Sequence, residues 1–320
     1  MLGRRKSLFT TLRQGSKLKE VKGKMGEMRV ERMQLLSLFP PAERGEGKVI
    51  FGSAEVMHEL DDESIHLVVT SPPYFNAPFD YPDFFPSYDA YLQMMERVAK
   101  EIFRVLARGR VACVVCDDVL VKGVRYPIVA DLTRLFMEVG FSYRDRITWL
   151  KPEGYIRISR RSGVLLQHPY PLYAYFDNVQ ESIIIFAKGK FDYKSVSPET
   201  REASRIDVER FLREKWYLNV WQITNVLPNP RRLEKGVAAF PEALAFRLIT
   251  LFSHKGEVVL DPFLGSGTTL KVAAALGRRG VGYEINTNLL PIIKEKLRGL
   301  SLDIIIRSDA ISIPLPSGGR

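Results

Sequence analysis

Residues 257–276 read EVVLDPFLGSGTTLKVAAAL, and the fold can be inferred from this stretch outward. The β-branched run 257–260 predicts a buried strand, and the apolar spacing of 268–276 predicts a helix. Gly265 and Gly267 form a turn between them, where backbone can come close to a ligand at the helix amino terminus. A strand, a glycine turn and a helix in this order predict a nucleotide-type binding loop at one edge of a parallel sheet.

Strands and helices alternate on both sides of this stretch, from Lys48 onward. This alternation predicts an α/β fold in which a doubly wound sheet carries helices on both faces. Segment 189–220 has no clear period, so we interpret it as an inserted module. The expected strands are 49–51, 65–70, 111–116, 144–150, 182–188, 257–260, 280–283 and 303–307, and the expected helices are 88–106, 127–139, 241–254, 268–276 and 289–300.

The composition restricts the class of protein. With 320 residues and 46% hydrophobic residues, the chain can build the core of a globular protein. Two cysteines exclude a disulfide framework and favour a reducing compartment, so we expect a cytoplasmic protein. No apolar run approaches the roughly 18 residues that span a bilayer, so we expect neither secretion nor membrane insertion.

Positive charge is concentrated at the amino terminus. Residues 1–30 hold nine basic and two acidic side chains, which is most of the net charge of +10. Residues 1–47 are therefore interpreted as a basic amino-terminal arm that either neutralises phosphates or is a solvated extension.

Three positions restrict which class of ligand the glycine turn can bind. A P-loop needs a Lys directly after its last glycine, but the first lysine here is Lys271, which disfavours NTP hydrolysis. Leu270 stands where a dinucleotide-binding loop has Gly or Ala, which weakens an NAD site. Glu284 ends the next expected strand, where such folds place an acid on ribose hydroxyls. The ligand is expected to be a nucleoside-bearing cofactor.

A second motif, Ser71-Pro72-Pro73-Tyr74, follows the expected strand 65–70. Consecutive prolines have no N–H donors and a fixed φ, so their carbonyls project rigidly from the strand end. Rigid acceptors suit an amine NH2 group, and Tyr74 offers a flat face for a base. Alone, the tetrapeptide could be a strand-terminating turn. Strand ends of a parallel sheet converge on one crevice, however, which predicts that both motifs share a site.

Together the two motifs resemble those of the S-adenosylmethionine-dependent methyltransferases that modify N4 of cytosine or N6 of adenine in nucleic acid. Their order is similar to that of the permuted (beta) group, in which a target-recognition segment lies between them. Residues 147–152, 181–188 and 239–241 resemble further family segments, so the likeness spans about residues 48–300. The resemblance implies a Rossmann-like methyltransferase sheet with direct methyl transfer, and we expect no metal.

The family pattern also implies roles for single residues. Ser71 and the carbonyl of Pro72 would bind the target amine, beside the rigid Pro73, and Tyr74 would stack on the base. Asp261, Gly265 and Gly267 would hold the methionine part of the cofactor, Glu284 its ribose and Phe240 its adenine. The full set expected at the cofactor is Asp261, Pro262, Phe263, Gly265, Ser266, Gly267, Thr268, Glu284 and Phe240.

The expected substrate is N4 of a flipped cytosine, because Ser71 stands where many adenine-modifying relatives have Asp or Asn. DNA is expected as the nucleic acid, because most members of the family modify DNA. The alternatives are N4-cytidine methylation of structured RNA such as rRNA, N6-adenine methylation of DNA, and a catalytically silent nucleic-acid-binding protein. A small-molecule methyltransferase is disfavoured by the basic charge and the insert. The resemblance also allows a role in restriction-modification beside a partner nuclease, which the sequence does not identify.

The resemblance divides the chain into residues 48–188 as the catalytic half, 189–235 as a target-recognition insert to which 151–180 contributes, and 236–320 as the cofactor-binding half. Basic residues among aromatics predict nucleic-acid contacts at Arg157, Arg160, Arg161, Lys190 and Lys194.

Some positions depart from the family pattern or remain ambiguous. Where relatives often have Gly-Asp, this chain has Gly52 and Ser53, so Asp309 is an alternative source of that acid. Cys113 and Cys116 lie three apart on one expected strand and so face opposite sides, which favours buried core thiols over a metal or redox pair. Asp117 and Asp118 follow that strand at the same expected edge; they could approach the substrate, but we interpret them as solvated turn acids.

Overall fold

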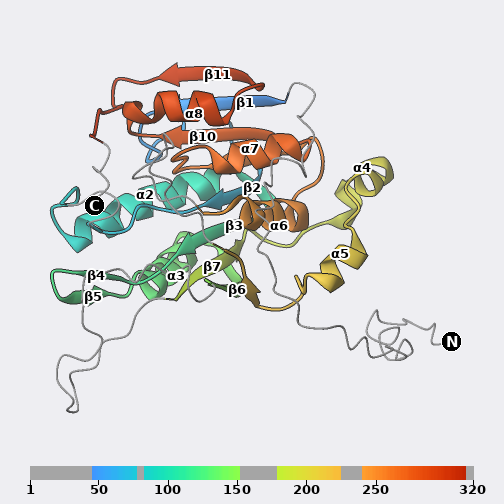
Figure 1. Cartoon of the computed structure of the whole chain (residues 1–320), viewed down its shortest axis with the longest axis horizontal. Helices are drawn as coiled ribbons and strands as arrows, with labels where there is room; N and C mark the ends of the chain where they lie inside the picture. The colour runs from blue at the N-terminus through green and yellow to red at the C-terminus, as the bar shows by residue number, and fades with distance from the viewer. Residues whose placement is uncertain (1–44, 78–82, 152–178, 225–239, 315–320) are drawn as a thin grey trace, which may run out of the picture. The chain divides into compact units, whose positions relative to one another are not determined.

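The computed structural model of the chain describes residues 45–77, 83–151, 179–224 and 240–314, all of which belong to the compact unit Phe39–Arg320. They contain one large sheet, with strand order β11-β1-β10-β9-β2-β3-β7-β6-β8 (Figure 1). Its strands are β1 (Glu46–Phe51), β2 (Ile65–Thr70), β3 (Leu106–Cys116), β6 (Ser142–Leu150), β7 (Gln180–Ala187), β8 (Val220–Gln222), β9 (Val258–Asp261), β10 (Arg279–Glu284) and β11 (Ser301–Ile306). A separate hairpin pairs β4 (Val119–Val121) with β5 (Val124–Tyr126).

Strand direction gives this sheet two different edges. Within the described sheet, β7 alone runs antiparallel to its neighbours, β3 and β6, and every other pair is parallel. We call the edge where the parallel strands end, and where β7 begins, the carboxyl edge. The opposite edge is the amino edge. This mostly parallel sheet with helices on both faces confirms the expected fold class.

Helices cover both faces of the sheet and bury three hydrophobic cores. The first packs α2 and α3 against one face, and the second packs α6 and part of α7 against the opposite face. The third packs α8 and the start of α7 against β1. The two cysteines face opposite sides of β3, as the sequence predicts. Cys116 belongs to the first core and Cys113 to the second, and both are buried free thiols. Burial raises the pKa of Cys113 to about 12, so it is an unreactive core residue. The helices are α2 (Tyr88–Val105), α3 (Ile128–Val139), α4 (Pro198–Ala203), α5 (Val208–Arg213), α6 (Glu242–Phe252), α7 (Thr268–Ala275) and α8 (Leu290–Lys296).

Strand β3 begins five residues earlier than the sequence predicts, at Leu106 rather than Val111. The polar residues in between obscure the strand pattern. Gly109 adopts a left-handed φ of 79°, and the register of β3 against β2 shifts between its pairs with Ile65 and Leu67. The strand therefore continues through a glycine-containing irregularity directly from the end of α2.

The segment after β7 contributes both helices and a strand. The short helices α4 and α5 lie on the amino side of the sheet (Figure 1), where a cavity of about 920 Å³ is lined by residues of this segment and by Arg278 and Arg279 near the start of β10. The chain then returns as β8, which pairs in parallel with β6 and was not expected because three residues give no periodic signal.

Candidate active site

Asp261 joins the two predicted motifs. Its Oδ1 accepts a hydrogen bond from Thr70 Oγ1 at 2.7 Å, directly before the tetrapeptide, and its Oδ2 accepts one from Thr269 Oγ1 at 2.6 Å, directly after the glycine turn. The backbone N–H of Phe263 also donates to Oδ1. Because β2 and β9 are neighbours in the sheet, Ser71–Tyr74 and the glycine turn lie side by side at the carboxyl edge.

Asp261 is only 2% exposed, and burial raises its pKa to about 7, against the opposing effect of hydrogen bonds from Thr269, Thr70 and the amide of Phe263. Each of these donors is uncharged. The carboxyl group therefore lies beneath the loop and links two strand ends. The sequence did not predict that Thr70 and Thr269 would donate to it.

The glycine turn depends on two left-handed backbone positions, Gly265 at φ 54° and Gly267 at φ 94°. Gly267 is the N-cap of α7, so the helix begins as the backbone turns. Glu284 accepts a hydrogen bond from the Gly265 N–H at 2.8 Å and one from the Asn286 N–H at 2.9 Å. The acid expected at the ribose thus also fixes the loop that would hold the methionine part of the cofactor.

The hydroxyls of the same loop have an unexpected partner. Lys296, at the end of α8, donates from Nζ to Ser266 Oγ at 2.8 Å and to Thr268 Oγ1 at 2.7 Å. Both hydroxyl residues are buried, at 1% and 4% exposure. Lys296 stands 28 residues after Thr268, so no local pattern could have revealed the contact.

Tyr74 is held by an acid from a different strand. Its hydroxyl donates to Glu181 Oε2 at 2.8 Å, and Lys151 Nζ lies 2.5 Å from Glu181 Oε1. Lys151 also lies over the ring of Trp149, at 5.2 Å from its centroid. Burial and the charge of Glu181 raise the pKa of Tyr74 well above its usual value, so the phenol stays neutral. The sequence identified the segments of Lys151 and Glu181, but not their contact with Tyr74.

The remaining expected cofactor residues lie on the elements that frame this edge. Phe240 precedes α6 and is 8% exposed, packed in the same core as Trp149. Pro262 and Phe263 begin the loop after β9, and Phe263 packs against the core on the opposite face.

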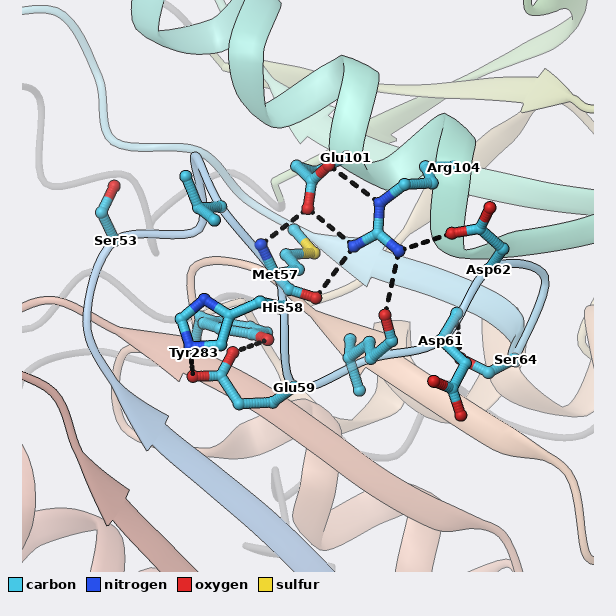
Figure 2. A network of polar contacts seen from close by, with 12 residues as sticks. Ser53, Met57, His58, Glu59, Asp61, Asp62, Ser64, Glu101, Arg104 and Tyr283 are labelled. Atoms are coloured by element: carbon cyan, nitrogen blue, oxygen red, sulfur yellow. Dashed lines mark hydrogen bonds and ion pairs between the residues drawn. The ribbon is translucent and has the colours of Figure 1, made fainter.

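The loop that follows β1 lies beside Glu284, the acid expected at the cofactor ribose. The N–H of Gly52 donates to the carbonyl of Glu284 at 2.9 Å. Figure 2 shows how helix α2 holds this loop: Arg104 donates to the carbonyls of Met57 and Leu60, and Glu101 accepts from the Met57 N–H. These side-chain hydrogen bonds tie the backbone of the loop after β1 to the last turns of α2.

An acid also reaches the position where family members often have Gly-Asp. Asp309 Oδ2 accepts from the backbone N–H of Ser53 at 3.1 Å and from Arg307 Nη2 at 2.9 Å. The carboxylate of Asp309 thus stands beside Ser53, although it comes from beyond β11.

Two of the predicted nucleic-acid contacts, Lys190 and Lys194, lie away from this site. Lys190 follows β7, whose end lies at the amino edge, and its carbonyl lies against Gly109 near the start of β3. Lys194 lies in the short helical turn Tyr193–Ser195 that follows. Arg157, Arg160 and Arg161 lie outside the described residues. The placement of Lys190 and Lys194 follows from the antiparallel direction of β7, which composition could not reveal.

Residues 65–295 match the family model of the N6/N4 methylases, described as DNA methylase. The chain belongs to this family. It is a DNA amino-methyltransferase that uses S-adenosylmethionine. The described residues fit that cofactor, because Gly265 and Gly267 bring bare backbone to the edge directly beside the carboxylate of Glu284.

Curated relatives and a solved structure agree with this assignment. The chain is 34% identical over 282 residues to the type II methyltransferase M.MjaI of Methanocaldococcus jannaschii, covering 78% of this chain and 90% of that protein. It is 32% identical over 290 residues to M.MthZI of Methanothermobacter thermautotrophicus, covering 81% and 79%. A Thermus thermophilus protein named as a putative DNA modification methylase, solved in complex with S-adenosyl-L-methionine, is 31% identical with a TM-score of 0.63, covering 81% of this chain and 99% of that one.

Membrane-spanning helices and metal clusters are both absent from the described residues. Within residues 45–77, 83–151, 179–224 and 240–314, no helix is long and apolar enough to cross a membrane. The same residues contain no group of three or more His, Cys, Asp or Glu side chains arranged to hold a metal ion.

Proposed function

We propose that this enzyme transfers a methyl group to the exocyclic N4 amine of a cytosine extruded from DNA. The observation that carries the proposal is the double hydrogen bond of Asp261 to Thr70 and Thr269, because it fixes the tetrapeptide beside the glycine turn. An amine-binding corner and a cofactor loop in one site are what direct transfer requires.

The tetrapeptide would orient the amine. Bound S-adenosylmethionine supplies a methyl group on a sulfonium sulfur. The hydroxyl of Ser71 and the carbonyl of Pro72 would accept the two amine hydrogens and direct the nitrogen lone pair toward that methyl. Tyr74 would stack on the extruded base while Glu181 holds its hydroxyl. Catalysis in this scheme comes from position and from hydrogen bonds that are in place before the base arrives.

The cofactor would lie across the glycine turn. The backbone at Gly265 and Gly267 would approach its methionine part, Glu284 its ribose and Phe240 its adenine. Glu284 keeps acceptor capacity for ribose hydroxyls, because each carboxylate oxygen can accept more than one hydrogen bond.

Phosphates near the target base would be contacted from segment 152–178. Its flanking residues Lys151 and Val179 lie at the carboxyl edge, where the Lys151 N–H donates to the Val179 carbonyl at 2.9 Å. Arg157, Arg160 and Arg161 would therefore start from the same edge as Ser71–Tyr74.

N6-adenine methylation is the second candidate. The chain is 25% identical over 269 residues to the DNA adenine methyltransferase YhdJ of Escherichia coli K12, covering 79% of this chain and 82% of that protein. The same acceptors and the same stacking ring could serve an adenine amine. Serine at position 71 is the feature that favours cytosine.

Product identity tests the proposal. The chain is incubated with S-adenosylmethionine carrying a tritiated methyl group and with duplex DNA, and the digested nucleosides are analysed by mass spectrometry. We expect N4-methylcytosine. N6-methyladenine would support the second candidate, and 5-methylcytosine would overturn amine methylation altogether.

Methyl transfer by the Tyr74→Ala variant, with Tyr193→Ala as its control, tests the candidate site. We expect slower methyl transfer in Tyr74→Ala. Tyr193 is 59% exposed at the amino edge, so its loss should leave methyl transfer unchanged. Absence of methyl transfer by the parent, with DNA binding lost in Tyr74→Ala, would instead indicate a silent binding protein.

A further inference from the structure

Asp117 occupies a position between the tetrapeptide and Glu181. On one side of β3, Val114 is in register with Thr70 of β2, and on the other side Cys116 is opposite Ser182 of β7. One residue further, Asp117 falls opposite Glu181 and beside the proline corner. Neighbouring strands are about 5 Å apart. The backbone of Asp117 therefore lies about one strand spacing from Ser71 and Pro72, which would hold the amine.

A hydrogen bond closes over the end of β3, where Asp117 stands. Tyr74 follows β2 on one side of β3, Glu181 belongs to β7 on the other side, and the Tyr74 hydroxyl donates to Glu181 Oε2 at 2.8 Å. In agreement with this placement, the negative charges of Glu181 and Asp117 raise the pKa of Tyr74. Lys151 closes the cluster from β6 through its ion pair with Glu181.

The neighbouring acid has a different task. Asp118 Oδ1 accepts from the Val129 N–H at 3.1 Å, at the start of α3. Asp118 therefore serves the fold, whereas Asp117 lies among the groups of the candidate site.

We propose that Asp117 is a catalytic residue that accepts the proton released by the target amine. This inference rests on the proposed amine methylation. The nitrogen lone pair forms the N–CH3 bond as the S–CH3 bond breaks, sulfur becomes a neutral thioether, and the positive charge moves to the base. One N–H proton then passes to the Asp117 carboxylate, which leaves a neutral methylated amine, and later to water.

The surroundings of Asp117 suit this task. Burial raises its pKa to about 7; a hydrogen bond from the Asp118 N–H opposes the shift, the charges of Glu181 and Asp118 add to it, and Lys151 lowers it. The other titratable groups nearby are Tyr74 and the buried Cys116, which adjoins Asp117 in the chain. A carboxylate with this pKa is ionised above neutrality and can still hold a proton briefly.

Single-turnover methylation rates of the full chain, measured from about pH 5.5 to about pH 9, test the inference. In the parent, the rate should rise about tenfold per pH unit below pH 7 and level off above it. Asp117→Asn should be about 10²-fold slower at pH 8 and independent of pH. Asp117→Glu should regain the pH dependence. Asp118→Asn is the control, because the Asn side-chain oxygen can still accept the Val129 N–H. It should keep the plateau rate and the rise with pH, with the midpoint moved slightly to lower pH because one negative charge beside Asp117 is lost.

Two results would overturn the inference: an Asp117→Asn rate within twofold of the parent with the same pH profile, or an equal loss in Asp118→Asn. The dissociation constants of S-adenosylmethionine and DNA, measured on the same variants, separate catalysis from misfolding, and we expect them unchanged in Asp117→Asn. The product tells the two proposals apart. N4-methylcytosine with an unaltered Asp117→Asn profile rejects only the role of Asp117, whereas N6-methyladenine with the predicted profile rejects only the choice of base.

Discussion

The two ends of strand β9 each carry a buried acid, and the two acids are satisfied in opposite ways. At the amino edge, Glu257 is 9% exposed, pairs with Arg110 and accepts the backbone N–H of His254. At the carboxyl edge, Asp261 is 2% exposed and is held by two threonine hydroxyls and one amide, all uncharged. One end closes on an ion pair, and the other joins two loops.

We infer that the acid before the four-residue strand β9, Glu257, serves mainly stability, whereas the acid at its end, Asp261, serves the candidate site. The ion pair of Glu257 with Arg110 ties the start of β9 to β3. The uncharged link at Asp261 keeps the proline corner and the glycine turn together. Ligands of parallel sheets bind beyond the carboxyl ends of the strands, which is why we propose the site at this edge.

The largest effect is expected when Asp261→Ala is compared with Glu257→Gln. Removing the Asp261 carboxyl group leaves two hydroxyls and an amide without an acceptor, so we expect a loss of about 3 kcal/mol in the free energy of unfolding. Methyl transfer should fall by at least about 10²-fold, because the two motifs lose their alignment. Glu257→Gln should lower stability but keep the turnover of each folded molecule. Denaturant unfolding with single-turnover assays measures both, and an equal loss of turnover in the two variants would refute the separation.

Tyr74 allows the contributions of stacking and positioning to be divided. Tyr74→Ala should slow methylation by about 10- to 100-fold, since stacking on a base contributes roughly 1–3 kcal/mol. Tyr74→Phe keeps the ring and removes the hydroxyl that donates to Glu181, so its decrease in rate should be smaller. Single-turnover rates at saturating DNA measure both, and equal losses would show that the hydroxyl rather than the ring is required.

The burial of Asp261 predicts a dependence of stability on pH. Its pKa is about 7 in the folded chain and near 3.9 when unfolded, so the unfolded state loses its proton first as pH rises. Asp261 therefore lowers stability progressively up to about pH 7. The stability of Asp261→Asn relative to the parent should rise by roughly 2–3 kcal/mol from pH 5 to pH 8. Asp145→Asn, at an exposed acid of β6, controls for charge removal, and a constant difference would refute the prediction.

The smallest effect is expected at the amino edge. Lys190→Ala combined with Lys194→Ala should leave the salt dependence of DNA affinity unchanged, because both residues lie away from Ser71–Tyr74. Arg160→Ala combined with Arg161→Ala should reduce the slope of log affinity against log salt by about 2, since each arginine would neutralise one phosphate. DNA affinity measured over a range of salt concentrations compares the two double variants. A larger change of slope in the lysine variant would show that DNA contacts the amino edge rather than the carboxyl edge.

Local patterns predicted the framework and both motifs. The boundaries of α2 and α3 agree with their apolar spacing to within one residue, and Ser71–Tyr74 and Asp261–Thr269 stand at strand ends as expected. The helix predicted at 289–300 is shorter, because α8 ends at Lys296 before Gly299, which adopts a left-handed φ of 94°. Helix periodicity is a signal within one segment, so it survives without knowledge of the fold.

The contacts that complete the site could not be predicted in this way. Tyr74 and Glu181 are 107 residues apart, and Thr70 and Asp261 are 191 apart, so only strand order brings them together. Lys190 shows the same limit in reverse. Its basic and aromatic neighbours suggested a nucleic-acid contact, but the direction of β7 places it at the other edge. The division into two halves and an insert remains a prediction.

Amide hydrogen exchange with and without S-adenosylmethionine tests whether the carboxyl edge is one site. We predict that the cofactor slows exchange in peptides covering residues 261–268 and also 70–75, because Asp261 couples the two motifs. Peptides covering 188–197 and 253–257 at the amino edge should exchange at the same rate in both states. Protection confined to the amino edge, or protection of 261–268 with no change in 70–75, would show that the two motifs do not form one site.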